Sequence, residues 1–131
     1  MELHFNEVLL INALRTFHAF LSSIGYRIAS LAFNGRDGDV IVYESLSRNR
    51  RVHIGYVVGF DILIIRRRNH WFLTRQETVS LKDVKMRFAD FAGLSGELDV
   101  ANNITLFNGY KRLMSEKLLP ILNGEKWFSE L

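Results

Sequence analysis

The stretch VIVYESLSRNRRVHIGYVVGFDILIIRR, residues 40–67, consists of three short apolar runs separated by turn-forming residues. The runs are rich in β-branched and aromatic residues, as strands are. In the second run, Val52 and Ile54 alternate with Arg51 and His53, which is typical of a strand with one buried face and one wet face. We therefore predict an antiparallel meander, with strands over residues 40–45, 50–57 and 60–67.

Residues on both sides of this stretch extend the predicted sheet and then change to a helical period. Residues 26–33 have the composition of a further strand, and residues 69–76 form either a fifth short strand or a loop. In residues 3–24, apolar side chains recur three and four positions apart, which indicates an amphipathic helix that Gly25 ends.

The C-terminal third also has helical spacing. Ser80 and Asp83 have the spacing of a capping box variant, so we predict a helix from there to Gly93. A last helix is expected to start near residue 102 or 103, to kink or restart at Pro120 and to end at Gly124. Two aromatic residues follow it and are expected to pack back on the chain: Trp127 and Phe128.

The predicted fold is a single α+β domain over residues 1–131. It has two layers: a four- to five-stranded antiparallel meander sheet, covered on one face by the N-terminal helix and the C-terminal helices. A sheet with one apolar face needs a cover, and the long helices are the only adequate covers in the sequence. The other face of the sheet is expected to be free for binding.

The composition excludes several classes of function. The apolar fraction is 48% and the charged fraction 24%, as in ordinary globular domains, and no cysteine is present for disulfides or thiolate sites. No apolar run is long enough to span a membrane and no signal peptide is apparent, so we expect a cytoplasmic protein. The four histidines do not occur at metal-ligand spacing, and we expect no metal or cofactor. His18 is interpreted as a partly buried structural residue of the first helix.

Charge is strongly polarised along the chain. Residues 46–75 contain seven arginines, no lysine and one acid, Asp61, which gives a net charge of +6, while the remainder, with 10 basic and 13 acidic residues, has a net charge of −3. Arginine binds carboxylate and phosphate with two parallel hydrogen bonds and stacks on aromatic rings. This segment is therefore the candidate interaction surface.

A tight turn at residues 58–59 would place Arg51 opposite Arg66 and Arg50 opposite Arg67. Like charges that oppose each other across an antiparallel pair are destabilising. The arrangement therefore requires an anionic complement: Asp61 or Glu44 within the chain, a neighbouring subunit, or a ligand.

Several interpretations of the arginine segment stay open at this point. Its charges either keep a sheet edge from pairing, or bind an acidic protein surface, or bind nucleic acid with help from aromatic side chains. A homodimer formed through the same surface is a related possibility. An enzyme that uses Glu44, Asp61 or His53 as acid or base is the last alternative. The candidate partner-binding residues are Arg48, Arg50, Arg51, His53, Arg66, Arg67, Arg68, Trp71 and Arg75.

The segments IGYRI, VIVYES, RRVHIGYVVGFDILIIRR and LLPILNGEKWF together resemble a group of small, uncharacterised bacterial proteins associated with immunity to toxins. The resemblance covers most of the chain and implies a non-enzymatic protein that binds a toxin. It assigns no individual ligand residues. Because this chain presents arginine, an immunity role implies a target with an acidic surface.

Overall fold

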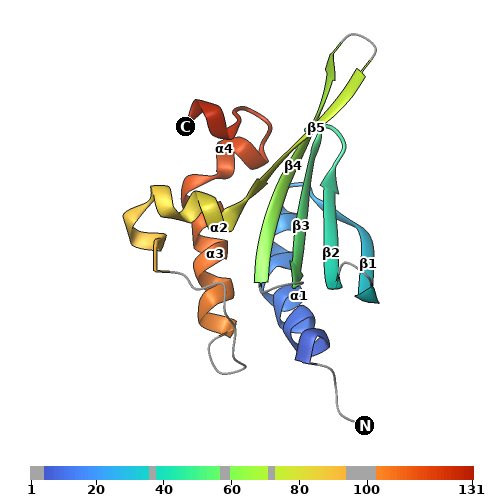
Figure 1. The fold of residues 1–131 in the computed structure, drawn as a ribbon, viewed down its shortest axis with the longest axis vertical. Helices are drawn as coiled ribbons and strands as arrows, with labels where there is room; N and C mark the ends of the chain where they lie inside the picture. The colour runs from blue at the N-terminus through green and yellow to red at the C-terminus, as the bar shows by residue number, and fades with distance from the viewer. Residues whose placement is uncertain (1–4, 36–37, 57–59, 71–72, 94–102) are drawn as a thin grey trace.

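The computed structural model describes residues 5–35, 38–56, 60–70, 73–93 and 103–131. One helix precedes a five-stranded antiparallel sheet in the order β1-β2-β3-β4-β5, and shorter helical segments follow it (Figure 1). The elements are α1 (Phe5–Ser23), β1 (Arg27–Gly35), β2 (Gly38–Ser45), β3 (Arg50–Tyr56), β4 (Phe60–His70), β5 (Leu73–Ser80), α2 (Leu81–Val84), the 3-10 turns η1 (Lys85–Arg87) and η2 (Ala89–Phe91), α3 (Asn103–Lys117), α4 (Leu119–Leu122) and the 3-10 turn η3 (Phe128–Glu130). The predicted α+β meander is confirmed, and the fifth strand is present.

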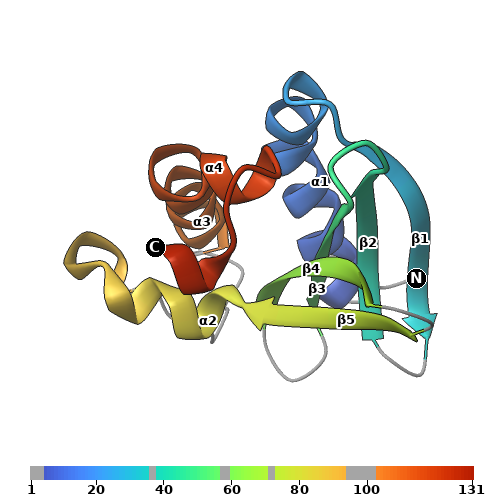
Figure 2. The same cartoon turned by 90° about the horizontal axis from the view of Figure 1, so that it is seen from above.

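Helices α1 and α3 lie on one face of the sheet, which we call the inner face (Figures 1 and 2). Aromatic rings fill the space between them. Phe107 of α3 lies 5.9 Å from Phe17 of α1 and 4.5 Å from Phe60 of β4, measured between ring centroids, and Tyr110 lies 5.6 Å from Phe60. All four residues are at most 2% exposed. Burial of side chains of this size stabilises the fold by roughly 1.5–3 kcal/mol each. In the described residues, no helix covers the opposite face, which we call the outer face.

The first helix ends as its glycine predicts. Gly25 has a φ of +94°, and its amide donates to the carbonyl of Ser22, while the amide of Tyr26 donates to the carbonyl of Leu21. This pair of bonds is a Schellman motif, which satisfies the free carbonyls at the end of a helix. The chain then enters β1 directly.

The prediction of one helix over residues 80–93 is wrong. Helix α2 has four residues, and the chain continues as two 3-10 turns that are separated at Phe88, whose φ of −123° and ψ of 112° are extended. The predicted capping box is also absent, because the Ser80 hydroxyl donates to Asp61 Oδ2 at 2.5 Å. The apolar pattern still marked the buried residues, since Leu81 and Val84 are at most 1% exposed.

The C-terminal segment follows the prediction more closely. Helix α3 ends at Lys117, and Pro120 lies in the first turn of the new helix α4, where a missing amide proton costs nothing. Trp127 and Phe128 pack edge to face with ring centroids 5.0 Å apart and are 3% and 4% exposed. None of the described helices has the length and apolar character needed to cross a membrane.

Strands β3 and β4 pair one residue away from the predicted register. Arg50 opposes Arg66 and Arg51 opposes Ile65, because three residues, 57–59, separate the strands instead of two. Opposed residues of an antiparallel pair point to the same face, so a slip of one residue changes which side chains share a face. The prediction that Arg51 opposes Arg66 is therefore wrong, and the arginines are distributed differently from what we expected.

Candidate functional site

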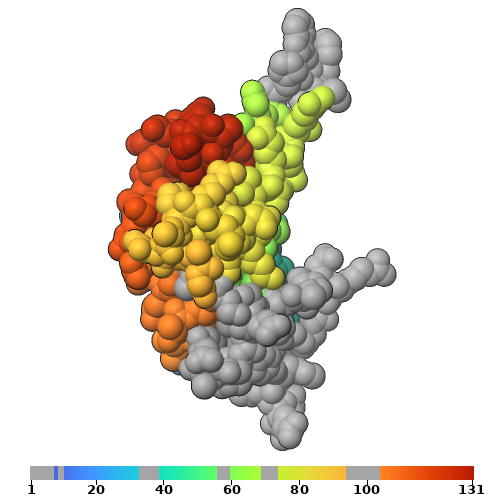
Figure 3. Space-filling view, turned by 60° about the vertical axis from the view of Figure 1, so that its left-hand side comes forward, coloured from blue at the N-terminus to red at the C-terminus, as the bar shows by residue number. Residues whose placement is uncertain are grey.

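Two of the arginines, Arg50 and Arg66, lie on the inner face, and both contact the ring of Trp127. Their guanidinium carbons lie 5.1 Å and 4.6 Å from the centre of the Trp127 ring, within the range of cation–π attraction. Figure 3 shows the C-terminal segment packed against the β4–β5 hairpin. The two arginines therefore hold the C-terminal segment onto the sheet.

Arg50 is the more deeply buried of the two, with 8% of its surface exposed. Its Nε donates to the carbonyl of Ile121 at 3.1 Å, and its Nη2 donates to the carbonyl of Lys126 at 3.3 Å. Burial is the main cause that lowers the pKa of this guanidinium. A side chain held in this way is not available to a partner.

Arg66 shares a carboxylate with a third arginine. Its Nη2 lies 2.9 Å from Glu77 Oε2, and Arg68 Nη1 lies 3.3 Å from Glu77 Oε1. The hydrogen bond from Arg66 is the main cause that lowers the pKa of Glu77. The complement of these two arginines therefore comes from β5, and neither Asp61 nor Glu44 supplies it.

Arg48 lies in the β2–β3 turn and is partly buried. Its Nη1 donates to Ser45 Oγ at 3.2 Å, and its carbonyl accepts a bond from Arg50. A β-carbon at Gly25 would come within 2.5 Å of Arg48 Nη1, so the turn packs closely against the end of α1. Arg48 is thus a packing residue of this corner.

The β4–β5 hairpin extends beyond the ends of β2 and β3 (Figure 1). Arg68 and Arg75 oppose each other on it, and both are exposed. One predicted site residue, Trp71, lies outside the described residues.

The outer face presents the remaining arginines beside apolar residues. Glu44 of β2 accepts two hydrogen bonds from Arg27 of β1, at 3.1 and 3.3 Å, and lies 3.9 Å from Arg51 of β3. Toward the middle of the same face, three part-buried or buried apolar side chains form a strip: Val42, Leu63 and Ile65. No described helix covers this strip.

His53 is in the middle of the outer face, between Val42 and Leu63. Its Nε2 atom is buried and has no hydrogen-bond partner. Burial, and next the charge of Arg51, lower the pKa of this imidazole. The prediction that His53 points outward is confirmed by its strand partners, whereas the full loss of solvent at Nε2 was not expected.

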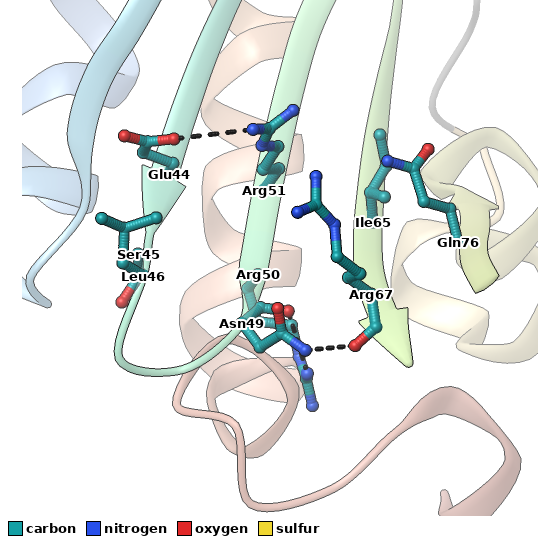
Figure 4. A pocket seen from close by; sticks show the side chains of 9 residues that line it. All are labelled: Glu44, Ser45, Leu46, Asn49, Arg50, Arg51, Ile65, Arg67 and Gln76. Carbon is teal, nitrogen blue, oxygen red and sulfur yellow. Dashed lines mark hydrogen bonds and ion pairs between the residues drawn. The ribbon is translucent and has the colours of Figure 1, made fainter. Parts of the chain in front are cut away.

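A small hollow lies at the end of this face, next to the β2–β3 turn (Figure 4). Its volume is about 60 Å³, far below the roughly 300–1,000 Å³ of metabolite pockets. Six of its lining residues matter for its chemistry: Glu44, Asn49, Arg51, Ile65, Arg67 and Gln76. The hollow suits a single small polar group.

The two arginines of the hollow are poorly satisfied. Arg51 and Arg67 point toward the same space in Figure 4, and within the described residues Arg51 has only the 3.9 Å contact with Glu44. Among the residues that the structure describes, none provides an ion pair or hydrogen bond to the Arg67 guanidinium. The carbonyl of Arg67 accepts a bond from Asn49, which fixes the backbone at this point. Two guanidinium groups thus face one hollow, and among the described residues the carboxylate nearest to them is that of Glu44, 3.9 Å from Arg51.

The acidic candidates have structural contacts. Glu44 pairs with arginines, as expected, but Asp61 does not: its carboxylate accepts bonds from the Ser80 hydroxyl and from the amides of Ile62 and Lys82. It therefore holds the start of α2. Within the described residues, no three metal-ligating side chains come together.

His18 also differs from its prediction. It is exposed, not partly buried, and its Nδ1 lies 3.1 Å from the Tyr43 hydroxyl. Burial is the cause that raises the pKa of Tyr43 to about 12.

Comparison of the chain with protein-family models, with curated protein sequences and with solved structures found no match. The interpretation of the site therefore depends on its own geometry.

Sequence reasoning did not find Trp127 as the partner of the two inner-face arginines, because it lies 61 or more positions from each of them along the chain. The segment NGEKWF, in which an isolated aromatic pair follows the end of a helix, was the one sequence pattern that pointed to a packing role for Trp127. Gln76 was missed because a glutamine in an uncertain strand has no distinguishing pattern.

Proposed function

We propose that this chain is a non-enzymatic protein-interaction domain that binds an acidic protein surface with the outer face of its sheet. The observation that carries the proposal is the pair Arg51 and Arg67, which lack close carboxylate partners among the described residues and lie beside an apolar strip that no described helix covers. An uncovered apolar patch next to arginine is typical of protein interfaces, where arginine is enriched.

The distribution of charge favours a protein over nucleic acid as the ligand. Four of the predicted binding residues have hydrogen bonds or close ion pairs within the fold: Arg48, Arg50, Arg66 and Arg68. The outer face is left with few cations and an apolar middle. Binding to nucleic acid depends on several phosphate contacts from exposed cations, and it gains nothing from Val42 or Leu63.

Nucleic acid is the second candidate, and the β4–β5 hairpin is the observation that favours it. Arg68 and Arg75 oppose each other on a hairpin that projects from the sheet. A two-stranded ribbon fits the major groove of DNA. The hairpin would then be the contact element and the outer face would have no part in binding.

Self-association through the outer face is unfavourable on the same grounds. Two copies that met with their two-fold axis at the hollow would bring their Arg51 and Arg67 side chains together with one Glu44 each. Like charges juxtaposed in an interface cost several kcal/mol. A homodimer with its two-fold axis at the hollow is therefore disfavoured.

The test is capture of partners from a lysate of the source cells, with and without nuclease. We compare the wild type with the double variant R51Q/R67Q and with a control, R15Q/R112Q, which removes the same charge from exposed arginines on α1 and α3. The expected result is nuclease-resistant capture of acidic proteins that R51Q/R67Q loses and the control keeps. If nuclease abolishes capture and capture depends on Arg68 and Arg75, the ligand is nucleic acid. If R51Q/R67Q and R15Q/R112Q capture partners equally well, the outer-face site is refuted.

An immunity role is the specific form of this proposal that the sequence resemblance favours. The acidic partner would be a toxin domain, and this chain would cover it. Co-expression of the chain with the proteins that it captures provides the test: the wild type should restore growth to cells that a captured toxin inhibits, and R51Q/R67Q should not.

A further inference from the structure

The hollow between Arg51 and Arg67 carries an inference that depends on the proposed function. We infer that it receives one carboxylate of the partner, a glutamate or aspartate side chain, and that this carboxylate takes Arg51 from Glu44. The inference names the chemical group that the site binds and an internal competitor for it.

The contacts of Glu44 make it a competitor that is easily displaced from Arg51. In the part of the chain that the structure describes, Oε1 of Glu44 has two hydrogen bonds from Arg27, whereas Oε2 has only the 3.9 Å contact with Arg51, beyond hydrogen-bond distance. Glu44 can therefore keep its bonds to Arg27 while Arg51 turns to a new acceptor. Arg51 is free to move, because its side chain is 43% exposed.

A carboxylate in the hollow would have more hydrogen-bond donors than the Glu44 carboxylate has from Arg51. A group placed between the two guanidiniums would accept hydrogen bonds from both, and planar guanidinium forks match a carboxylate with two parallel bonds. Gln76 also lines the hollow, and Ile65 forms an apolar wall. A volume of about 60 Å³ accommodates a carboxylate and leaves the apolar stem of a glutamate against Ile65 and the strip beyond it.

This geometry predicts effects of opposite sign from two neighbouring residues. R67Q removes one of the two forks and should weaken binding about tenfold, the effect of losing a charge-assisted hydrogen bond. E44Q removes the competitor and its repulsion and should strengthen binding by up to about fivefold, the value of an exposed ion pair. A purely structural role of Glu44 would predict weaker binding, since E44Q would remove the ion pairs that link β2 to Arg27 of β1 and Arg51 of β3.

The experiment is fluorescence anisotropy with a labelled peptide of alternating glutamate and leucine, titrated with the wild type, R67Q, E44Q and the control E116Q. Glu116 has an exposed ion pair with Arg112 on α3, at 3.4 Å, so E116Q changes the net charge equally at a distance from the hollow. Thermal melting of each variant checks that it folds. The expected order of affinity is E44Q above wild type and E116Q, which are equal, and R67Q below them.

The outcomes separate this inference from the proposed function. If the peptide binds and E44Q does not strengthen binding, or E116Q strengthens it equally, the exchange at Arg51 is refuted and the acidic-partner role stands. If the peptide does not bind while lysate capture still requires Arg51 and Arg67, the carboxylate is refuted and the interface stands. If a phosphorylated peptide of the same length binds better than the glutamate peptide and responds to E44Q, the group received is a phosphate, and the inference of a carboxylate is wrong. If the peptide does not bind and lysate capture does not depend on the two arginines, both proposals fail.

Discussion

Replacement of Arg50 and of Arg51, adjacent residues of β3, should have very different effects on stability. Arg50 donates to two carbonyls of the C-terminal segment and stacks on Trp127, while Arg51 has one exposed ion pair at 3.9 Å. Hydrogen bonds from a charged group contribute about 1.5–3 kcal/mol each, so R50A should lower the free energy of unfolding by about 3 kcal/mol. R51A should lower it by about 1 kcal/mol or less.

The assay is equilibrium unfolding in urea, with the thermal midpoint as a second measurement. For a chain of 131 residues, 1 kcal/mol corresponds to about 4 °C in the melting temperature, so we expect a loss of about 12 °C for R50A and below about 4 °C for R51A. An unchanged urea dependence (m-value) would show that only stability changed. R50K serves as the control for charge: lysine keeps the cation but not the planar fork, and it should recover less than half of the loss.

The reasoning would be refuted if R51A destabilised the protein as much as R50A. That result would show that the contacts of Arg50 with the C-terminal segment contribute no more to stability than the exposed ion pair of Arg51. A loss below about 1 kcal/mol in both variants would show that neither arginine holds the C-terminal segment in place.

Three further predictions concern single positions. Gly25→Ala should destabilise the protein by about 1 kcal/mol or more, because its φ is +94° and a β-carbon there meets a guanidinium, whereas Gly93→Ala, with nothing within 4 Å, should be neutral; thermal melting compares the pair. Tyr26→Phe should lower the free energy of unfolding in urea by about 1–2 kcal/mol, because the buried hydroxyl donates to a carbonyl of α4 at 2.6 Å; no change would mean that water replaces this bond. His53→Phe should reduce the loss of stability on acidification: burial lowers the pKa of His53 below its usual 6.5, so the unfolded chain takes up the proton first and stability falls as the pH drops through that value. Melting temperatures from about pH 8 to about pH 5 test this, and parallel curves for the variant and the wild type would contradict it.

Local patterns in the sequence were sufficient for most of the fold. The alternation around Val52 and Ile54 identified a half-buried strand, and Gly25 identified the end of the first helix, because both signals depend on residues a few positions apart. The helix predicted over residues 80–93 failed for the converse reason. Asp61 of β4 accepts the hydrogen bond from the Ser80 hydroxyl that would have capped the helix. The helix is also interrupted at Phe88, which is extended although the apolar spacing is helical.

The candidate site was only partly predictable. The charge count located the arginine segment and Glu44 as a partner, but it treated the arginines as one exposed group. The structure divides them: Arg50 and Arg66 on the inner face with Trp127, Arg51 and Arg67 on the outer face at the hollow. Arg66 shares a face with Arg50, and not with Arg51 as predicted, because one additional residue separates β3 from β4.

By itself, then, the sequence determined the order of the elements, the apolar face of the sheet and the concentration of arginine in residues 46–75. These properties follow from composition and from apolar periodicity, which can be recognised within one or two helical turns or a few residues of a strand. Only the tertiary structure decided which arginines pack against Trp127 on the inner face and which lie on the outer face. That decision depends on the strand register and on the approach of Trp127 from the far end of the chain, and both are set by packing between residues that no local pattern connects.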